Sequence, residues 1–376
     1  MVKVKEIIDI VEEFAPSTAC ADWDNVGLQV GKKDDEVNGI LLTLDVTQEV
    51  IRESSERGAN LIICHHPITL GKIRSIDVDD FEGGRLWAAA NSNINVIVAH
   101  TNLDACPGGV SDVLAERIEL KEIEILFDRK APARFKLVCF VPPANLEEVA
   151  NAIVKAGGGM IGEYTHCTFR VRGTGTFKPG RTSKPSIGAG GKVNEVEEFR
   201  LETLVPSEHL PNVIAAMIEA HPYEAVAYDV YGLEDAPAAA GESSSFGLGR
   251  IGNLRRPRLL SECLRIWRGK LGFSDAKVSG DLSRTIERVA VCGGSGGGMI
   301  AIAAERGADV LLTGDVKYHD AQLADFLGLA VVDAGHYATE YPVVPKLASL
   351  IGQKLKDKAE AVKVMVSEVD TNPWNS

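Results

Sequence analysis

The chain has 376 residues, of which 45% are hydrophobic and 25% charged, and its formal net charge is -13. This length exceeds the usual single core and predicts two domains. The acidic balance argues against broad electrostatic binding to nucleic acid or to an anionic membrane. The seven cysteines lack CxxC spacing, which is typical of reduced thiols rather than of a disulfide framework.

The N-terminal segment predicts an amphipathic helix. Apolar residues recur at helical spacing among acids over residues 4–14, and the segment lacks the apolar core of a signal peptide. No apolar stretch approaches the length of a membrane span. We therefore expect a cytoplasmic protein with no membrane partner.

An internal repeat relates two distant parts of the chain. Residues 40–66, ILLTLDVTQEVIRESSERGANLIICHH, align without a gap with residues 289–315, VAVCGGSGGGMIAIAAERGADVLLTGD. Each copy predicts a strand, a helix and a second apolar strand, which is one βαβ unit. The apolar runs 61–63 and 310–312 do not alternate with polar residues, as is typical of strands covered on both faces. We expect an α/β fold in which two similar halves form one layered metal-binding domain.

The segment between the halves has a different character. Its predicted elements follow the order β-α-β-β-α-β, which is the ferredoxin-like pattern, and residues 234–245 predict a linker. The predicted organisation is a first half of the α/β domain, an insertion domain and a second half, over residues 1–128, 129–240 and 241–376.

Side chains that can bind metal ions follow three of the predicted strands, and in open α/β sheets sites assemble at such strand ends. These side chains are His65, His66, Asp104, His336 and Glu340. Each has an ordinary alternative: a chance histidine pair, a turn-forming aspartate, or an i, i+4 pair on a solvated helix face. Together they form a mixed imidazole and carboxylate set that is typical of two neighbouring divalent ions such as Zn, Fe or Mn.

The adjacent histidines place a condition on this site. Neighbouring residues of a strand point to opposite faces. His65 and His66 can therefore both be ligands only if the strand ends there or if two ions receive them.

Other residues around the strand ends are candidates for catalysis. We consider His319 as a proton shuttle or substrate contact, His100 as a partner that orients a ligand carboxylate, and Asp315 at the strand end related by the repeat. Each can equally be a satisfied polar residue near a sheet edge. Asp24 and Asn25 could line the same cleft, whereas Trp23 is interpreted as a core residue.

The run GGSGGG at residues 293–298 also has two interpretations. Its backbone N–H groups could cradle a phosphate, but it lacks the Lys-Ser/Thr of a P-loop. A tight turn in which two chain segments approach closely explains it at least as well. In the insertion, His166, Cys167 and His221 have no partners at ligand spacing, and we interpret them as structural.

Seven segments in chain order resemble the Nif-three-like dinuclear metal-centre family, named from an NGG-one-interacting factor and also known as GTP cyclohydrolase I type 2 homologues. They are ADWDNVGLQVG, GILLTLDVT, GANLIICHHPI, AHTNLDACPGGVSDVLAE, VCGGSGGG, LLTGDVKYHDA and DAGHYATEYP. HPYEAVAYDVY in the insertion is similar to the PII or CutA-like domain of the family's longer members. This chain departs from the family at Cys64 and Cys106, where small residues are expected, and we interpret both thiols as buried small hydrophobes.

The resemblance implies two divalent metal ions per subunit, held by the five ligand candidates. It also implies a ring-shaped homohexamer whose insertion domains cap the openings. The leading functional hypothesis is a metal-dependent hydrolase acting on a small nucleotide or phosphoester-like substrate. The alternative is a non-catalytic metal-binding or regulatory ring. A nucleic-acid partner inside the ring is a third hypothesis, against which the acidic charge argues.

Overall fold

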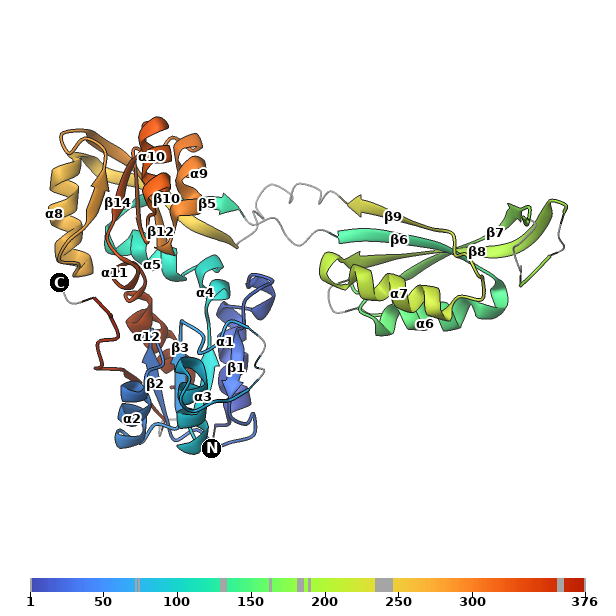
Figure 1. The fold of residues 1–376 in the computed structure, drawn as a ribbon, viewed down its shortest axis with the longest axis horizontal. Coiled ribbons are helices and arrows are strands. Elements are labelled where there is room, and N and C mark those ends of the chain that lie inside the picture. Colours follow the sequence, from blue (N-terminus) through green and yellow to red (C-terminus); the bar gives the residue numbers. More distant parts are fainter. Residues whose placement is uncertain are drawn as a thin grey trace. The chain divides into compact units, whose positions relative to one another are not determined.

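The computed structural model describes most of the chain, namely residues 2–71, 73, 75–128, 134–161, 164–180, 186–188, 191–233, 246–356 and 362–374 (Figure 1). It divides into one unit of residues 1–129 with 244–376 and a second unit of residues 130–243. The predicted domain boundaries, beside residue 129 and at residues 240–241, and the linker predicted over 234–245 lie outside the described residues. In the part of the chain that the structure describes, no helix combines the length and apolar character needed to cross a bilayer.

The N-terminal half of the first unit is built on a five-stranded sheet with the order β1-β4-β3-β2-β15. Its central strands are mutually parallel, β15 is parallel to β2, and β1 is antiparallel to β4. The strands are β1 (Gly27–Val30), β2 (Gly39–Thr43), β3 (Leu61–Cys64), β4 (Asn95–Val98) and β15 (Lys363–Val366).

Helices cover both faces of this sheet. Ile40 and Leu42 of β2 pack with α1 (Val4–Phe14) and α12 (Val343–Leu355). Leu41 between them packs with α2 (Gln48–Glu56) and α3 (Phe81–Asn91) on the opposite face. Because neither face meets water, the interior positions of the central strands are apolar, and polar residues occur only at strand ends, as at Thr43 and Asn95. The expectation that these strands are covered on both faces is confirmed.

The second half has a six-stranded sheet of order β11-β14-β13-β12-β10-β5. One face packs against α5 and α8, and the other against α9 and α10. The strands are β5 (Lys121–Asp128), β10 (Gly247–Leu259), β11 (Lys277–Ser279), β12 (Thr285–Ser295), β13 (Val310–Gly314) and β14 (Ala330–Asp333). The helices are α5 (Val110–Arg117), α8 (Leu260–Leu271), α9 (Ile300–Glu305) and α10 (Tyr318–Phe326).

The register of the strands reproduces the sequence repeat. Ile40 of β2 pairs with Leu61 of β3, and Val289 of β12 pairs with Val310 of β13. These are equivalent residues in the ungapped alignment. The strands that flank them also correspond, because β4 and β14 are parallel to their neighbours and each is followed at the edge by an antiparallel strand. The mixed α/β fold with two similar halves is therefore confirmed.

The second unit is a four-stranded antiparallel sheet of order β7-β8-β6-β9. Its elements follow the predicted β-α-β-β-α-β order, and α6 and α7 cover one face of the sheet (Figure 1). The relation to PII or CutA-like domains stays a prediction. The elements are β6 (Arg134–Val141), α6 (Leu146–Lys155), β7 (Thr168–Phe177), β8 (Asn194–Pro206), α7 (Leu210–Ala220) and β9 (Tyr228–Leu233).

A buried ion pair joins β10 to α5 within the first unit. Arg250 is 3% exposed, and its Nε and Nη2 donate to the two carboxylate oxygens of Asp112 at 2.7 Å each. Nη1 donates to the carbonyl oxygens of Gly247 and Gly249, and Nη2 also donates to that of Cys106. This geometry satisfies the guanidinium, so the pair fixes the strand relative to the helix.

Replacing Arg250 with methionine is expected to lower the free energy of unfolding by about 3–5 kcal/mol, because the substitution leaves the Asp112 carboxylate without its partner. Urea denaturation of the metal-free protein, followed by circular dichroism, measures the loss. Lys346→Met, which breaks the exposed pair with Glu116, is the control and should cost about 1 kcal/mol or less. Equal losses in the two variants would contradict this account.

Candidate metal centre

The first two ligand candidates stand at the point where β3 ends. The strand stops at Cys64, whose carbonyl accepts a hydrogen bond from the Ala99 N–H, while the His66 N–H donates to the carbonyl of Leu44. The strand thus ends just before His65 and His66. The first histidine, His65, is 1% exposed, and its Nδ1 lies 2.9 Å from the carbonyl oxygen of Ala99.

The third candidate belongs to the short helix α4 (Thr101–Ala105), which follows β4. The N–H of Asp104 donates to the carbonyl of His100, so the aspartate lies one turn into the helix. The buried Asn102 anchors this helix, because its amide donates to the carbonyl of Ala15 and its Oδ1 accepts the His100 N–H. The anchored helix therefore holds the backbone of Asp104 in place, and this fixes where its carboxylate lies.

The last two candidates occupy the ends of α11 (His336–Glu340), which follows β14. Gly335 precedes the helix with φ of 86°, a conformation that glycine adopts without steric cost. Asp333 accepts hydrogen bonds from the N–H groups of Gly335 and Val316, which ties this turn to the one after β13. The helical i, i+4 spacing then places His336 Nε2 3.0 Å from Glu340 Oε2.

The structure brings all five predicted ligands together as two groups of three that share Glu340. His65, Asp104 and Glu340 form one group, and His66, His336 and Glu340 form the other; within each group, ligand atoms lie within 4.8 Å of one another. The adjacent histidines thus serve different groups. This arrangement meets both conditions that their adjacency imposed, because the strand ends before them and each group receives one of them.

The atoms at the centre of each group fit a cation. His65 Nε2 lies 3.7 Å from both Asp104 Oδ1 and Glu340 Oε1, whereas atoms that share a tetrahedral ion at about 2.1 Å lie roughly 3.4 Å apart. Among the described residues, the buried His65 Nε2 has no hydrogen-bond partner. Buried polar atoms without partners are costly. A divalent ion would satisfy this nitrogen.

The ligand atoms of the second group lie closer together than those of the first. Glu340 Oε2 lies 2.9 Å from His66 Nε2 and 3.0 Å from His336 Nε2, and the two Nε2 atoms are 3.2 Å apart. In neutral imidazoles whose Nδ1 carries the proton, these nitrogens present lone pairs to one another and to the carboxylate. Such a cluster needs positive charge at its centre.

Carboxylates behind the rings orient these nitrogens. His66 Nδ1 lies 2.7 Å from Asp45 Oδ1, and His336 Nδ1 lies 2.6 Å from Asp315 Oδ2. A hydrogen bond from Nδ1–H to a carboxylate fixes the tautomer in which Nε2 is free to bind metal, and it raises the basicity of that nitrogen. The pattern is typical of metal-binding histidines.

The charges of the cluster shift the pKa values of its members. Burial lowers the pKa of His66, but its hydrogen bond with Asp45 and its interaction with Glu340 outweigh burial and raise the pKa to about 10. His336 is likewise raised to about 9 by Glu340 and Asp315 against the effect of burial. Burial raises the pKa of Asp104 to about 6. Without a metal ion, bound protons therefore supply the positive charge that the cluster requires.

His100 borders the cluster, and its geometry differs from the expected one. Its ring forms a further group with His65 and His66, but its Nδ1 lies 2.8 Å from Asp24 rather than from a ligand carboxylate. Burial opposes ionisation of Asp24, yet hydrogen bonds with His100 and Thr101 outweigh it and hold the pKa of this carboxyl below its ordinary range. His100 is thus oriented in the same manner as His66 and His336.

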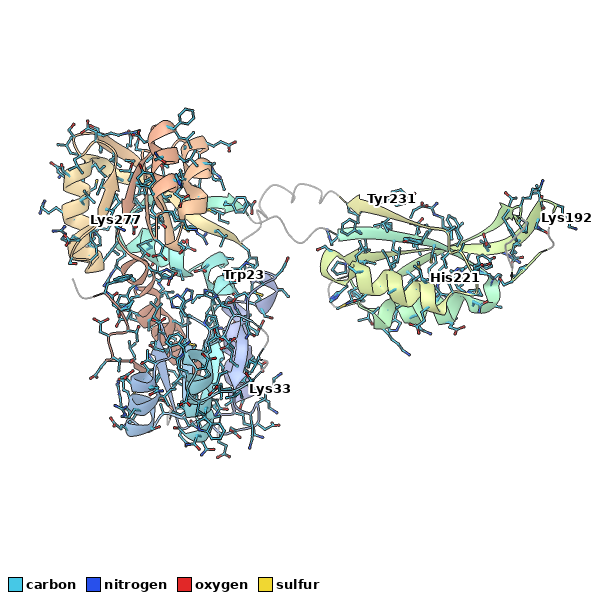
Figure 2. The ribbon with its side chains drawn as sticks, viewed as in Figure 1. Trp23, Lys33, Lys192, His221, Tyr231 and Lys277 are labelled. Carbon is cyan, nitrogen blue, oxygen red and sulfur yellow. The ribbon has the colours of Figure 1, made fainter. Side chains whose placement is uncertain are left out.

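Trp23, labelled in Figure 2, lies beside this histidine. Its ring makes an edge contact with His100 at 6.1 Å between centroids, and the residue is 62% exposed. The interpretation of Trp23 as a core residue is therefore wrong. The indole lies at the surface next to the candidate metal centre, where it can contact a substrate.

The other two catalytic candidates occupy different positions. Asp315 accepts hydrogen bonds from both His336 and Ser295 and has φ of 53°, so its contacts are those of a residue that orients a ligand. His319 is exposed, and its Nδ1 lies 2.9 Å from Gln322 Oε1 on the same helix. The structure does not bring His319 into the ligand groups.

The glycine run makes room for the cluster. A Cβ on Gly294, whose φ is 62°, would lie 2.1 Å from Glu340 Oε1 and 3.2 Å from His336 Nε2. Cβ atoms on Gly293 and Gly296 would meet Val110 and Thr313 at 2.3 and 2.1 Å. These distances support the interpretation that chain segments approach closely here, although Gly293 and Gly294 belong to the end of β12 and not to a turn.

Sequence reasoning missed two residues and judged two others correctly. Asp45 was not singled out, although it follows the end of β2 at the same sheet edge as the ligands, and Asp24 was placed in the cleft without its contact to His100. Cys64 and Cys106 are completely buried, and burial raises the pKa of the Cys106 thiol to about 12. Both behave as small hydrophobes, as predicted.

Fold and cluster together define a class of protein in which two repeated α/β halves carry a buried set of imidazoles and carboxylates. The family model that matches residues 2–373 is described as Duf34/NIF3 (NGG1p interacting factor 3), and the chain belongs to this family. A GTP cyclohydrolase 1 type 2 homolog of Bacillus subtilis is 41% identical over 373 residues, covering 98% of this chain and 97% of the relative. The corresponding protein of Halalkalibacterium halodurans is 39% identical over 371 residues, with the same coverage.

Solved structures agree with this assignment. A Bacillus cereus protein related to NIF3 superposes with a TM-score of 0.69 at 38% identity, covering 100% of this chain and 99% of the other. Reduced HcgD from Methanocaldococcus jannaschii has a TM-score of 0.58 at 23% identity, covering 98% of each chain. At that identity the second likeness concerns the fold alone.

Gly294→Ala is expected to lower divalent-metal affinity at least about tenfold, because the added methyl group displaces the Glu340 carboxylate and strains the backbone. Metal content after dialysis against Zn²⁺ or Mn²⁺, measured by mass spectrometry, reports the loss. Gly298→Ala in the same run is the control, since its Cβ would have no heavy atom within 4 Å. Equal metal content in the two variants would contradict the role assigned to Gly294.

Proposed function

We propose that this protein is a dinuclear, divalent-metal-dependent hydrolase that acts on a nucleotide or phosphoester-like substrate. The observation that carries the proposal is the division of the five candidate ligands, of which His65 and Glu340 are buried, into two groups joined by one carboxylate. In such a pair of groups, Glu340 would bridge two ions, with His65 and Asp104 holding one and His66 and His336 holding the other. Zn, Fe and Mn suit this mixed nitrogen and oxygen set.

Two neighbouring divalent ions, when bound, activate water at neutral pH and stabilise negative charge that develops on a phosphoryl or carbonyl oxygen. The residues of the chain prepare the site for this chemistry. Asp45 and Asp315 hold the rings of His66 and His336 from behind, so little reorganisation accompanies binding. Asp24 holds His100 beside the cluster, where its imidazole can contact the substrate or move a proton.

The substrate class rests on chemistry and on relatives. Two closely spaced ions are typical of enzymes that act on phosphates, and the curated relatives carry the name GTP cyclohydrolase 1 type 2 homolog. The exposed indole of Trp23 next to His100 offers a surface on which a nucleobase can stack. A nucleotide or another phosphoester satisfies all three features.

Metal content is the first test. Anomalous scattering across the Zn, Fe and Mn edges, on crystals grown without added metal, is expected to show two peaks flanking the Glu340 carboxylate. His65→Ala should lose at least one of them, whereas His319→Ala, the control at an exposed histidine outside the cluster, should keep both. A single peak in the wild type would overturn the dinuclear assignment, and two peaks in His65→Ala would overturn the role of His65 as a ligand.

Turnover is the second test. The metal-loaded protein is screened against nucleoside triphosphates, phosphodiesters and phosphomonoesters, and we expect hydrolysis that His65→Ala abolishes. His100→Ala should keep both ions but lower kcat by about 10²–10⁴-fold. Loss of an ion in His100→Ala would make His100 a ligand instead. No turnover that depends on His65 would refute the enzyme assignment.

Surface composition favours a second candidate, a ring-shaped homohexamer that binds metal without catalysis. The segment over residues 70–87 of the first unit exposes six large apolar side chains, namely Leu70, Ile73, Ile76, Val78, Phe81 and Trp87. Exposed apolar clusters of this kind commonly mark association surfaces. Light scattering on the metal-loaded protein would distinguish a hexamer from smaller species. A hexamer that retains two ions and hydrolyses none of the compounds would establish this second function.

A further inference from the structure

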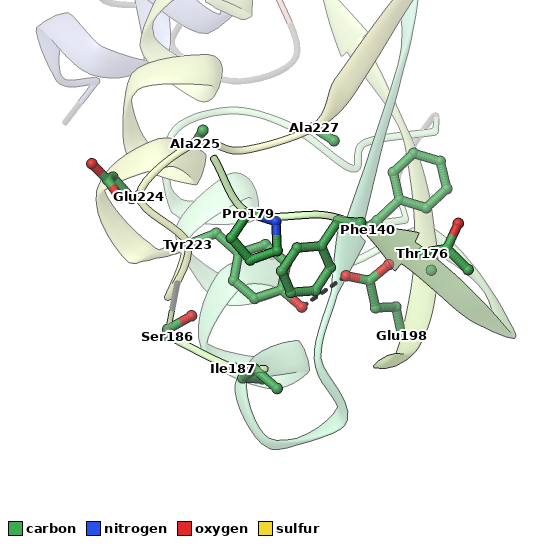
Figure 3. Close-up of a pocket in the computed structure, with 12 residues that line it drawn as sticks. Phe140, Thr176, Pro179, Ser186, Ile187, Glu198, Tyr223, Glu224, Ala225 and Ala227 are labelled. Carbon is green, nitrogen blue, oxygen red and sulfur yellow. Dashed lines mark hydrogen bonds between the residues drawn. The ribbon is translucent and has the colours of Figure 1, made fainter. Parts of the chain in front are cut away.

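The second unit contains a pocket of about 480 Å³ that the proposed metal chemistry does not use (Figure 3). It lies where the C-terminal end of β7, the side chain of Glu198 on β8 and the segment 223–227 meet. Its walls include the apolar side chains of Phe140, Phe177 and Ile187. A pocket of this size and composition is typical of small-molecule sites.

One polar pair faces these apolar walls. The Tyr223 hydroxyl donates to Glu198 Oε1 at 2.8 Å, and Figure 3 shows this bond within the pocket. Burial raises the pKa of Tyr223, and the hydrogen bond to Glu198 raises it further. The phenol therefore stays protonated and acts as the donor to Glu198.

Gly175 leaves room for the second carboxylate oxygen of Glu198. A Cβ on Gly175 would lie 2.1 Å from Glu198 Oε2, so any other residue on β7 at this position would displace the carboxylate. The hydrogen bond from Tyr223 engages Oε1, and a carboxylate can accept several more bonds. Glu198 is thus held by its neighbours with acceptor capacity left for a ligand.

His221 fixes the turn that carries Tyr223. Its Nδ1 accepts the Tyr223 N–H at 3.2 Å, which leaves the proton on Nε2, and Nε2 donates to the carbonyl of Phe140 at 3.0 Å. This histidine is 7% exposed and ties two residues of the pocket wall together. The interpretation of His221 as structural agrees with these contacts. The two hydrogen bonds of His221 hold Phe140 and Tyr223 in their positions in the pocket wall.

The charges around the pocket favour a cation. Its lining residues include the carboxylates Glu198 and Glu224 and, among the residues that the structure describes, no lysine or arginine. Arg200 lies two residues along β8, with its guanidinium carbon 6.0 Å from the centroid of the Phe140 ring. It does not line the pocket, and its Nε donates to Glu202 Oε1 at 2.6 Å, so its charge is already paired with a different carboxylate.

We propose that this pocket binds a small organic cation, whose protonated nitrogen pairs with Glu198 and whose aromatic or apolar body packs against Phe140, Phe177 and Ile187. An anion would face Glu198 without a compensating charge from the lining residues. A neutral ligand would leave the carboxylate desolvated without an ionic partner, which costs free energy. The site is separate from the metal centre, so the proposal does not depend on the proposed hydrolysis.

Three ligands of one shape test the proposal on the full-length protein. Tryptamine, tryptophol and indole-3-propionate share an indole and a two-carbon arm but end in an ammonium, a hydroxyl and a carboxylate. Titration calorimetry at pH 7 is expected to show tryptamine binding about tenfold to hundredfold more tightly than the other two. Equal affinities, tighter binding of either other ligand, or no measurable binding of tryptamine would overturn the proposal.

Four variants test where tryptamine binds. Glu198→Gln keeps the size of the side chain and should remove the preference for tryptamine, whereas Glu195→Gln, an exposed position on the opposite face of β8, should keep it. Ala227→Trp, which fills the pocket from an exposed lining position, should abolish binding while circular dichroism stays unchanged. His65→Ala should bind tryptamine like the wild type. A preference for tryptamine that survives in Glu198→Gln, binding that survives in Ala227→Trp, or binding that is lost in His65→Ala would place the site elsewhere.

Discussion

The buried carboxylate of Glu340 is the constraint on which the metal centre depends. Only 4% of this residue is exposed, and a buried negative charge is costly unless positive charge compensates it. Burial by itself would raise the pKa of Glu340, but His65, His336 and His66 hold it well below the ordinary value. The same electrostatics hold protons on His66 and His336. The cluster is therefore arranged around a centre of positive charge that either protons or metal ions can provide.

The repeated architecture explains how the residues around this positive charge come together within one unit. Each half supplies parallel strands whose carboxyl ends carry polar residues: His65 and His66 follow β3, whereas His336 and Glu340 follow β14. Neither of the two groups that share Glu340 comes from one half alone, because the first half contributes no bridging carboxylate and the second only one histidine of the four around the cluster. The Arg250–Asp112 pair adds a polar tie between β10 and α5, within the unit that must hold both sets in register.

Much of this organisation could be predicted from the sequence, and the rest depends on contacts that sequence spacing does not encode. Apolar runs and the ungapped repeat predicted the central strands, because burial on both faces dictates composition directly. The five candidate ligands stood out because three of them are histidines, which are few in this chain, and because all five follow predicted strands. Asp24 and Asp45 did not stand out as partners of histidines, because an aspartate after a strand or in a loop is commonly a turn residue. Which imidazole such an aspartate contacts depends on the tertiary fold. Trp23 was misjudged because apolar character alone does not separate a core indole from one at the edge of a site.

Two glycines show how far the backbone itself participates in binding. Gly294 in the first unit and Gly175 in the second each leave a space that a Cβ would fill at 2.1 Å from a glutamate oxygen. The reasons differ: Gly294 has positive φ at a point of β12 where the pairing with β13 is irregular, whereas Gly175 lies in the regular pairing of β7 with β8. In both places a side chain on the glycine would displace the carboxylate, so the bare backbone leaves the room that the carboxylate occupies. A carboxylate that its hydrogen-bond partners already orient loses little freedom when it binds a cation, and this feature is common to the two cation sites that we propose.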